Sequence, residues 1–305
     1  MPFKINIDMK NIAQRIMLLM VCLGVAGTSC RKSEANAGKP IIELISGEGL
    51  IAKDTSVVEA ATLKFRVHCN WNGEDELTNL IVFNNGGRVV DEGMYQKEFQ
   101  KDVIFAKTSN EYDSIAFVIR DIKGKSGTTS LRVDKKEGSS GELIRYNNIS
   151  LDAQNVSGAK SFMALSDGTT YTLQDAYNNQ SSINLLYYYD VVSSDGNTIS
   201  SPGANIDASI YTGTYGLSNW TTVNRKTTRF IELSLTQQQF DTISRPSYIV
   251  NAYGSNVGYR KAKNLAAGDA YAFFVENTGK YGIFRVSSLT GQEAGNVVLS
   301  IVMQK

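Results

Sequence analysis

Few side chains in this sequence can carry chemistry by their residue type alone. The 305 residues include one histidine, His68, and three cysteines, Cys22, Cys30 and Cys69. A zinc site takes several Cys or His ligands, and a Ser-His-Asp or Cys-His nucleophile would have to be built on His68. We therefore predict no catalytic residue of these kinds, no metal ion and no other cofactor.

Paired carboxylates are the hydrolytic machinery that this composition still allows. Glycosidases place two of them about 5–10 Å apart in a cleft. Asp167, Asp175 and Asp190 are acidic residues of the C-terminal half, but their spacing does not single out a pair. The sequence favours a solvated surface role for these acids and leaves a carboxylate-dependent glycoside hydrolase as an alternative.

The stretch "NLLYYYDVV" is the most aromatic of the chain. On a strand, Tyr187 and Tyr189 share one face and Tyr188 takes the other. Exposed rings would form a glycan-binding platform, because the C–H faces of sugars stack on aromatic rings, whereas buried rings would be core and a cross-strand pair. Tyr187, Tyr188 and Tyr189 are thus candidate ligand-binding residues, with packing as the competing interpretation.

The next loop, "DVVSSDGNTIS", holds the oxygen-bearing side chains of Asp190, Asp195 and Asn197. Such loops can bind calcium, but this spacing does not follow the EF-hand pattern. Asp195-Gly196 is typical of a tight hairpin turn. The turn explains the loop without a metal.

Two short motifs, "DSI" at 113–115 and "DTI" at 241–243, resemble an O-glycosylation signal of exported Bacteroidetes proteins. Thr242 falls in an expected helix. Ser114 is therefore the candidate modification site, with chance occurrence as the alternative.

The elements that must position these residues are mostly strands. In "VVEAATLKFRVHCNW" the residues Leu63, Phe65, Val67 and Cys69 fall on one face, which predicts a strand with one buried side. "LTNLIVFNNGGRVVD" predicts a hairpin that turns at Asn85-Gly86-Gly87. About seven short strands between residues 40 and 137 indicate a small β-sandwich, in which Cys69 is a buried thiol without a disulfide partner.

Residues 141–305 follow a polar hinge, "EGSSGE", and contain longer strands. "LTQQQFDTI" predicts a helix that Thr236 caps, with Gln239 completing a capping box and Pro246 stopping the continuation. A second short helix is expected within 173–180. The predicted fold is mainly β, with two β-sandwich-like domains, the second carrying one or two short helices.

The N-terminal residues are typical of an export signal. Ile16–Gly27 is a mostly apolar run of a signal peptide's length and too short to cross a bilayer. "GTSC" resembles a bacterial lipobox, although Gly27 stands where an aliphatic residue is usual. The resemblance implies a leader at 1–29, diacylated Cys30 and a flexible tether at 30–39; an ordinary secretory signal is the alternative.

Charge argues against a nucleic-acid partner. The 31 basic and 30 acidic residues nearly cancel. Removal of the leader takes away three basic residues and one acidic residue, so the net charge becomes −1. No Lys/Arg run has the density that nucleic-acid binding requires.

Two longer stretches carry family resemblances. "IAFVIRDIKGKSGTTSLRV", through Asp121 and Gly124, resembles the last hairpin of bacterial Ig-like or PKD-like domains, which usually act as spacers or partner-binding modules. The segments "ALSDGTTYTLQDAYNNQSSINLLYYYD", "SPGA" at 201–204, Trp220, "LTQQQFDTI" and "LAAGDAYAFFVENTGKYGIFRV" resemble a β-rich C-terminal domain of Bacteroidetes lipoproteins. The resemblance implies family membership without a known reaction.

These observations predict an outer-membrane lipoprotein of the cell envelope that acts by binding, without catalysis, in adhesion or in capture of extracellular polymer. The membrane, through the lipid, and a glycan or protein ligand are the expected partners. A glycan-binding accessory protein of a polysaccharide-uptake system and a glycoside hydrolase are the alternatives. The face of the outer membrane stays open.

Overall fold

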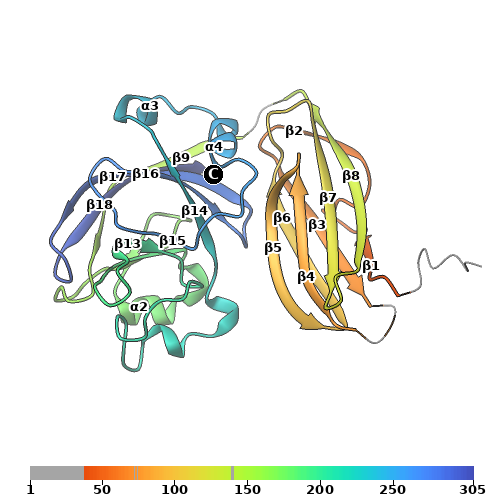
Figure 1. Cartoon of the computed structure of the whole chain (residues 1–305). Coiled ribbons are helices and arrows are strands. Elements are labelled where there is room, and N and C mark those ends of the chain that lie inside the picture. Colours follow the sequence, from red (N-terminus) through yellow and green to blue (C-terminus); the bar gives the residue numbers. More distant parts are fainter. Residues whose placement is uncertain (1–37, 72, 74, 139–140) are drawn as a thin grey trace, which may run out of the picture. The chain divides into compact units, whose positions relative to one another are not determined.

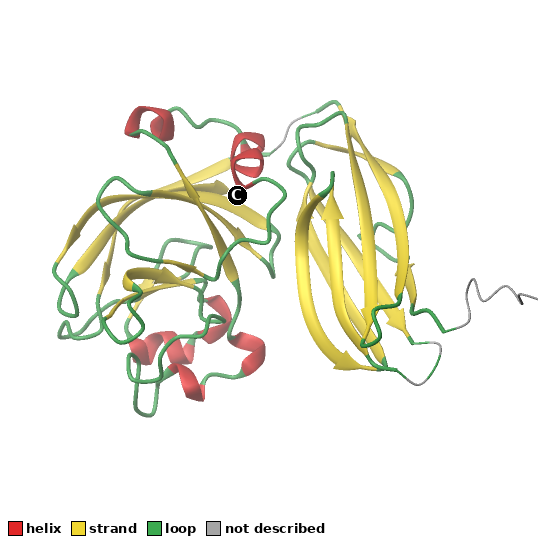
Figure 2. Ribbon diagram, viewed as in Figure 1, coloured by secondary structure: helices red, strands yellow, loops and turns green. Residues whose placement is uncertain are grey.

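The computed structural model describes residues 38–71, 73, 75–138 and 141–305. The predicted leader, most of the tether and Cys30 therefore lie outside the described residues. Strands dominate the described part and helices are few and short (Figures 1 and 2). The four sheets pair into two β-sandwiches, so the predicted fold class is confirmed.

The first sandwich contains the strands β1 to β8. Its three-stranded sheet has the order β1-β3-β6, and its five-stranded sheet has the order β2-β8-β7-β4-β5. The strands are β1 (Ile41–Ile45), β2 (Thr55–Val58), β3 (Thr62–Asn70), β4 (Leu77–Asn84), β5 (Gly87–Gln96), β6 (Glu98–Ala106), β7 (Tyr112–Asp121) and β8 (Ser126–Lys136). Neighbours are antiparallel except β2 and β8, which are parallel.

Every second residue of β3 points into the core of the first sandwich. Leu63, Phe65, Val67 and Cys69 are each fully buried, as their spacing predicts. The residues between them face outward, and among these His68 contacts the Glu98 carboxylate at 2.9 Å. A strand with one buried face needs this period of two.

Turn chemistry closes the hairpins of the first sandwich. Asn85 and Gly86 both adopt positive φ, at 51° and 82°, between β4 and β5, as a two-residue hairpin turn requires. Between β7 and β8 the Asp121 carboxylate accepts hydrogen bonds from the backbone N–H groups of Lys123 and Lys125. Gly124 supplies the positive φ in this turn.

The second sandwich contains two five-stranded antiparallel sheets, β11-β10-β12-β13-β15 and β14-β16-β17-β18-β9. The strands are β9 (Leu143–Asp152), β10 (Phe162–Met163), β11 (Thr170–Tyr171), β12 (Leu185–Asp190), β13 (Gly196–Ser200), β14 (Thr228–Leu233), β15 (Lys261–Ala262), β16 (Ala270–Val275), β17 (Lys280–Thr290) and β18 (Asn296–Gln304). Between the sheets, Tyr187 and Ile199 share one core with Phe273, Phe284 and Leu299.

Short helices and loops cover the outer faces of both sheets of the second sandwich. The helices are α2 (Leu173–Asn178), α3 (Gln237–Asp241) and α4 (Pro246–Tyr253), with the 3-10 turns η1 (Gln180–Ser182), η2 (Leu217–Asn219) and η3 (Thr222–Asn224). Phe240 and Ile249 pack on Phe274 of β16. On the other sheet, Ala176 and Trp220 join the cluster around Tyr188. Figure 1 shows α3 and α4 on one side of this sandwich and α2 on the other.

The helices fit the sequence prediction in part. Thr236 caps α3 and Gln239 completes the capping box, as predicted. The described residues contain three short α-helices rather than one or two, because Pro246 is the first residue of α4. Proline suits that position, where its missing N–H would have no intrahelical partner and its φ is already helical.

Candidate functional site

The candidate tyrosines lie in the packed interior. Tyr187 and Tyr188 are both fully buried, and Tyr189 is half-buried. The Tyr187 hydroxyl donates to Asn197 Oδ1 at 2.7 Å, and burial raises the pKa of this phenol to about 12. The buried rings of Tyr187 and Tyr188 cannot stack on a sugar. Tyr187 packs between the sheets and Tyr188 in the outer cluster, as the competing packing interpretation holds.

The oxygen-bearing side chains of the β12–β13 loop each bind a different partner and do not converge. Asp190 Oδ1 accepts from the backbone N–H groups of Val192 and Ser193. The Asp195 carboxylate is paired with Lys261 and Lys263. The described residues gather no group of three or more His, Cys, Asp and Glu side chains that could hold a metal ion.

The two other acids considered for hydrolysis are also engaged locally. Asp167 accepts from the backbone N–H of Thr169 at 2.9 Å. Asp175 accepts from the Thr172 hydroxyl at the start of α2. Both contacts stabilise turns, which fits the structural interpretation of these acids.

Ser114 is exposed on β7, and its backbone N–H donates to Asn85 Oδ1 at 2.9 Å. The neighbouring Asp113 is fully buried. A hydroxyl at such a position is accessible to a modifying enzyme, and glycosylation of Ser114 stays a prediction.

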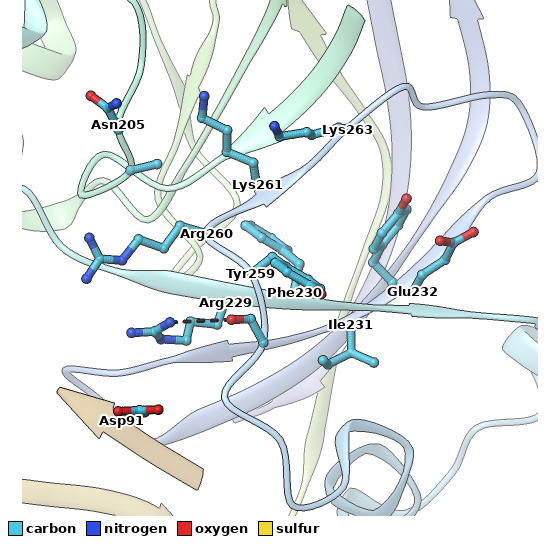
Figure 3. A pocket seen from close by; sticks show the side chains of 13 residues that line it. Asp91, Asn205, Arg229, Phe230, Ile231, Glu232, Tyr259, Arg260, Lys261 and Lys263 are labelled. Atoms are coloured by element: carbon cyan, nitrogen blue, oxygen red, sulfur yellow. Dashed lines mark hydrogen bonds between the residues drawn. The ribbon is translucent and has the colours of Figure 1, made fainter. Parts of the chain in front are cut away.

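The second sandwich holds a cavity of about 870 Å³ that the sequence did not predict. Its lining consists of Ala204, Asn205, residues 229–232, residues 258–261, Lys263 and Tyr271, together with Asp91 of β5. Figure 3 shows how the labelled side chains lie around it. Strand β14 supplies four of these residues, and the loops after β13 and around β15 supply Ala204, Asn205, residues 258–260 and Lys263. Such loops on a rigid β scaffold commonly carry binding residues.

Tyr259 is the exposed aromatic residue of this cavity, with 76% of its surface accessible. Its backbone is held in place, since Tyr259 and Phe230 of β14 exchange two backbone hydrogen bonds of 2.7 and 3.0 Å. Buried Phe230 and Tyr271 contribute apolar surface to the lining. An exposed ring on a fixed backbone can stack on a flat apolar face of a ligand.

Basic side chains also line the cavity. Lys261 and Lys263 contact the two oxygens of Asp195 at 2.6 and 2.5 Å. Asp195 is almost fully buried, whereas half of the Lys263 side chain is exposed. The hydrogen bonds and charges of the two ammonium groups lower the pKa of Asp195 against the opposing effect of burial. Two cations thus share the single carboxylate of Asp195.

The guanidinium groups of Arg229 and Arg260 lie on the same side of the view in Figure 3. Arg229 is paired with Glu276. Arg260 donates to the Gly203 carbonyl at 3.2 Å, and no carboxylate of the described residues lies within ion-pair distance of it. Arg260 is therefore a cation in this cavity without an acidic partner in the part of the chain that the structure describes.

The sequence contains a signal that points to this cavity. "GYRKAK" at 258–263 puts an aromatic and three basic residues within six positions. Their proximity to residues 204, 229 and 271 depends on pairing between β13, β14, β15 and β16, which the sequence does not specify residue by residue.

Comparisons with known proteins give distant similarity in fold. No family model matches, and no curated protein matches. A DUF4466 family protein from Parabacteroides merdae shares 12% identity and a TM-score of 0.37 over 88% of this chain and 99% of that one. The fibronectin(III)-like modules of Clostridium thermocellum CbhA share 12% over 32% of this chain and 47% of theirs, with a TM-score of 0.23.

A CARDB domain of Pyrococcus furiosus, solved with di-metal ions, shares 15% identity over 32% of this chain and 96% of its own, with a TM-score of 0.23. Within the described residues, no helix has the length and apolar character needed to cross a bilayer.

Proposed function

We propose that this protein is a lipoprotein of the bacterial outer membrane, anchored through Cys30, that binds an extracellular polysaccharide in the cavity beside Tyr259. The observation that carries the binding proposal is the exposed Tyr259 ring on a fixed backbone, next to cationic groups. Carbohydrate sites combine such a ring with polar side chains that fix orientation. The lipobox resemblance at Cys30 supports the location.

The acids of the cavity favour binding over glycoside hydrolysis. Hydrolysis needs one carboxyl group with a raised pKa to protonate the leaving group. A hydrogen bond from Asn79 and the charge of Arg88 lower the pKa of Asp91. Among the described residues that line the cavity, Glu232 is the one other carboxylate. The lining therefore offers only Glu232 as a candidate for the protonated acid of a hydrolytic pair.

Binding is tested with the full-length lipoprotein in detergent micelles on an array of neutral and acidic polysaccharides. We expect retention on at least one polysaccharide and loss of most of it in Tyr259→Ala. Tyr248→Ala is the matched control, because Tyr248 is also exposed but lies on α4, outside the cavity lining. Retention that Tyr259→Ala leaves unchanged would place the site elsewhere, and absence of retention by folded protein would sink the proposal.

The anchor is tested separately in living bacteria. Cys30→Ala should abolish incorporation of radiolabelled palmitate and release the protein from the membrane fraction, because each buried methylene of a lipid chain contributes about 0.8 kcal/mol to anchoring. Cys69→Ala removes a thiol from the first core and should leave labelling intact. Continued membrane fractionation of Cys30→Ala after a high-salt wash contradicts the anchor.

A further inference from the structure

The "SPGA" segment, Ser201–Ala204, forms a tight turn at the edge of the cavity. The Ala204 N–H donates to the Ser201 carbonyl at 3.0 Å, which closes a four-residue β-turn. Gly203 does not adopt a positive φ, so the turn does not require glycine for its backbone conformation. The need for glycine at this position has another cause.

That cause is close backbone packing. A Cβ on Gly203 would lie 2.7 Å from the Arg225 carbonyl oxygen and 2.9 Å from the Lys226 carbonyl oxygen. The Gly203 N–H donates to that same Lys226 carbonyl at 2.8 Å. The turn is therefore pressed against residues 225–227, and its position is fixed.

Two guanidinium groups hold the carbonyls of this turn. Arg225 donates from Nε to Pro202 O at 3.1 Å and from Nη2 to Ala204 O at 3.2 Å. Arg260 donates from Nη1 to Gly203 O at 3.2 Å. Three successive backbone carbonyls of the turn thus accept hydrogen bonds from two guanidinium groups, which fixes both groups beside the turn.

These contacts leave donors unused. Toward the described residues, Arg225 Nη1 and Arg260 Nε and Nη2 make no hydrogen bond, and neither arginine has a carboxylate within ion-pair distance. A guanidinium fork that is already oriented binds a planar carboxylate or a sulfate at low cost in entropy. Lys261 and Lys263, on the same segment as Arg260, also line the cavity and share the Asp195 carboxylate.

We infer that the cavity takes an acidic polysaccharide, whose carboxylate or sulfate groups bind the Arg260 guanidinium while a sugar ring stacks on Tyr259. This inference rests on the proposed function and names its ligand class. The oriented Arg260 guanidinium would recognise the anion at short range, because the near-neutral chain has no long-range electrostatic field. A nucleic acid, which is recognised through high positive charge density, fits this surface less well.

The experiment compares polygalacturonate with its carboxyl-reduced form, which has the same backbone without charge, and dextran sulfate with dextran. Full-length protein in micelles should bind one or both acidic polymers at least about tenfold more tightly than the uncharged counterpart, and binding should weaken between 50 and 500 mM salt. The two acidic arms distinguish a carboxylate from a sulfate.

Variants of Arg260 test whether this residue is responsible for acidic-polymer binding. Arg260→Gln should weaken acidic-polymer binding about tenfold, and Arg260→Lys should weaken it less, because a lysine keeps the charge but not the fork. Arg245→Gln is the matched control, since Arg245 is exposed at the start of α4 and does not line the cavity. Thermal melts of all three confirm folding.

Each alternative result has a distinct meaning. Equal affinity for charged and uncharged polymers would overturn the acidic class while the proposed function survives. Equal loss in Arg245→Gln and Arg260→Gln, or equally tight binding of single-stranded DNA, would reduce the effect to general charge attraction and overturn the site. Failure to bind any polysaccharide would overturn the proposed function as well.

Discussion

The two sandwiches differ in what lies on the outer faces of their sheets. In the first sandwich, β3 and β7 alternate between buried and outward-facing residues. In the second, every residue of β16 is buried, as are five of the six residues of β12. The covering helices and loops create this difference, since a strand can be apolar on both faces only when both are covered.

The covering layers determine which strands can present side chains to a ligand. Two layers pack on β12, so Tyr187 and Tyr188 are buried on opposite faces and contribute to stability. The segments that lead into and out of the covered sheets carry Arg225, Tyr259 and Arg260 instead. In the second sandwich, the candidate site lies on β14 and on loops that adjoin the covering layers.

The largest expected effect contrasts two ion pairs. In the first sandwich, fully buried Lys107 donates to Thr108 O and Asn110 O and lies 3.3 Å from fully buried Asp113. Lys107→Met leaves the Asp113 charge buried without its cation, which should cost about 3–5 kcal/mol of unfolding free energy.

The matched change in the second sandwich is Lys263→Met. Lys263 is half exposed and Asp195 keeps Lys261, so the cost should stay below about 1 kcal/mol. Urea unfolding at constant m-value measures both variants. Equal costs would mean that burial does not separate the two pairs.

The same valine-to-alanine change on an outer face of each sandwich should have different costs. Val302 of β18 is fully buried beneath α3 and α4, whereas Val118 of β7 is half-buried on an outer face. Val302→Ala should cost about 2–3 kcal/mol from lost burial and a residual cavity. Val118→Ala should cost under about 1 kcal/mol, and a ranking reversed in urea melts would refute the covering layers.

Thiol accessibility gives the smallest and most local test. Burial raises the pKa of Cys69 from 9.0 to about 12, and the side chain is fully enclosed. Cys69 should therefore react with a maleimide only when the first sandwich opens. On a Cys69→Ala background, Val118→Cys should react rapidly and Val302→Cys slowly; rapid labelling of wild-type Cys69 would contradict its burial.

The raised pKa of Cys69 makes the free energy of unfolding depend on pH in the alkaline range. The folded state holds the Cys69 proton more tightly than the unfolded chain, so the stabilisation is full below about pH 9 and is lost as the pH rises toward about 12. Cys69→Ala should remove this part of the alkaline slope. Comparison of the two unfolding curves across that range measures it.

The sequence alone determined the elements whose reasons are local. The alternation in β3, the Asn85-Gly86 turn and the capping box at Thr236 follow from residue type and spacing within a few positions, and the structure confirms all three. The same local reasoning took Pro246 as a stop, although a proline serves equally well as the first residue of a new helix.

The burial of the tyrosines and the assembly of the candidate site depend on tertiary structure. Whether Tyr187 and Tyr188 stack on a ligand or pack in a core depends on layers contributed by residues far away in the chain. The arginine pair beside "SPGA" exists because a turn after β13 is pressed against residues 225–227 and Arg260 reaches its carbonyl. Long-range packing, rather than local propensity, brings these groups together, and so it alone created the candidate site.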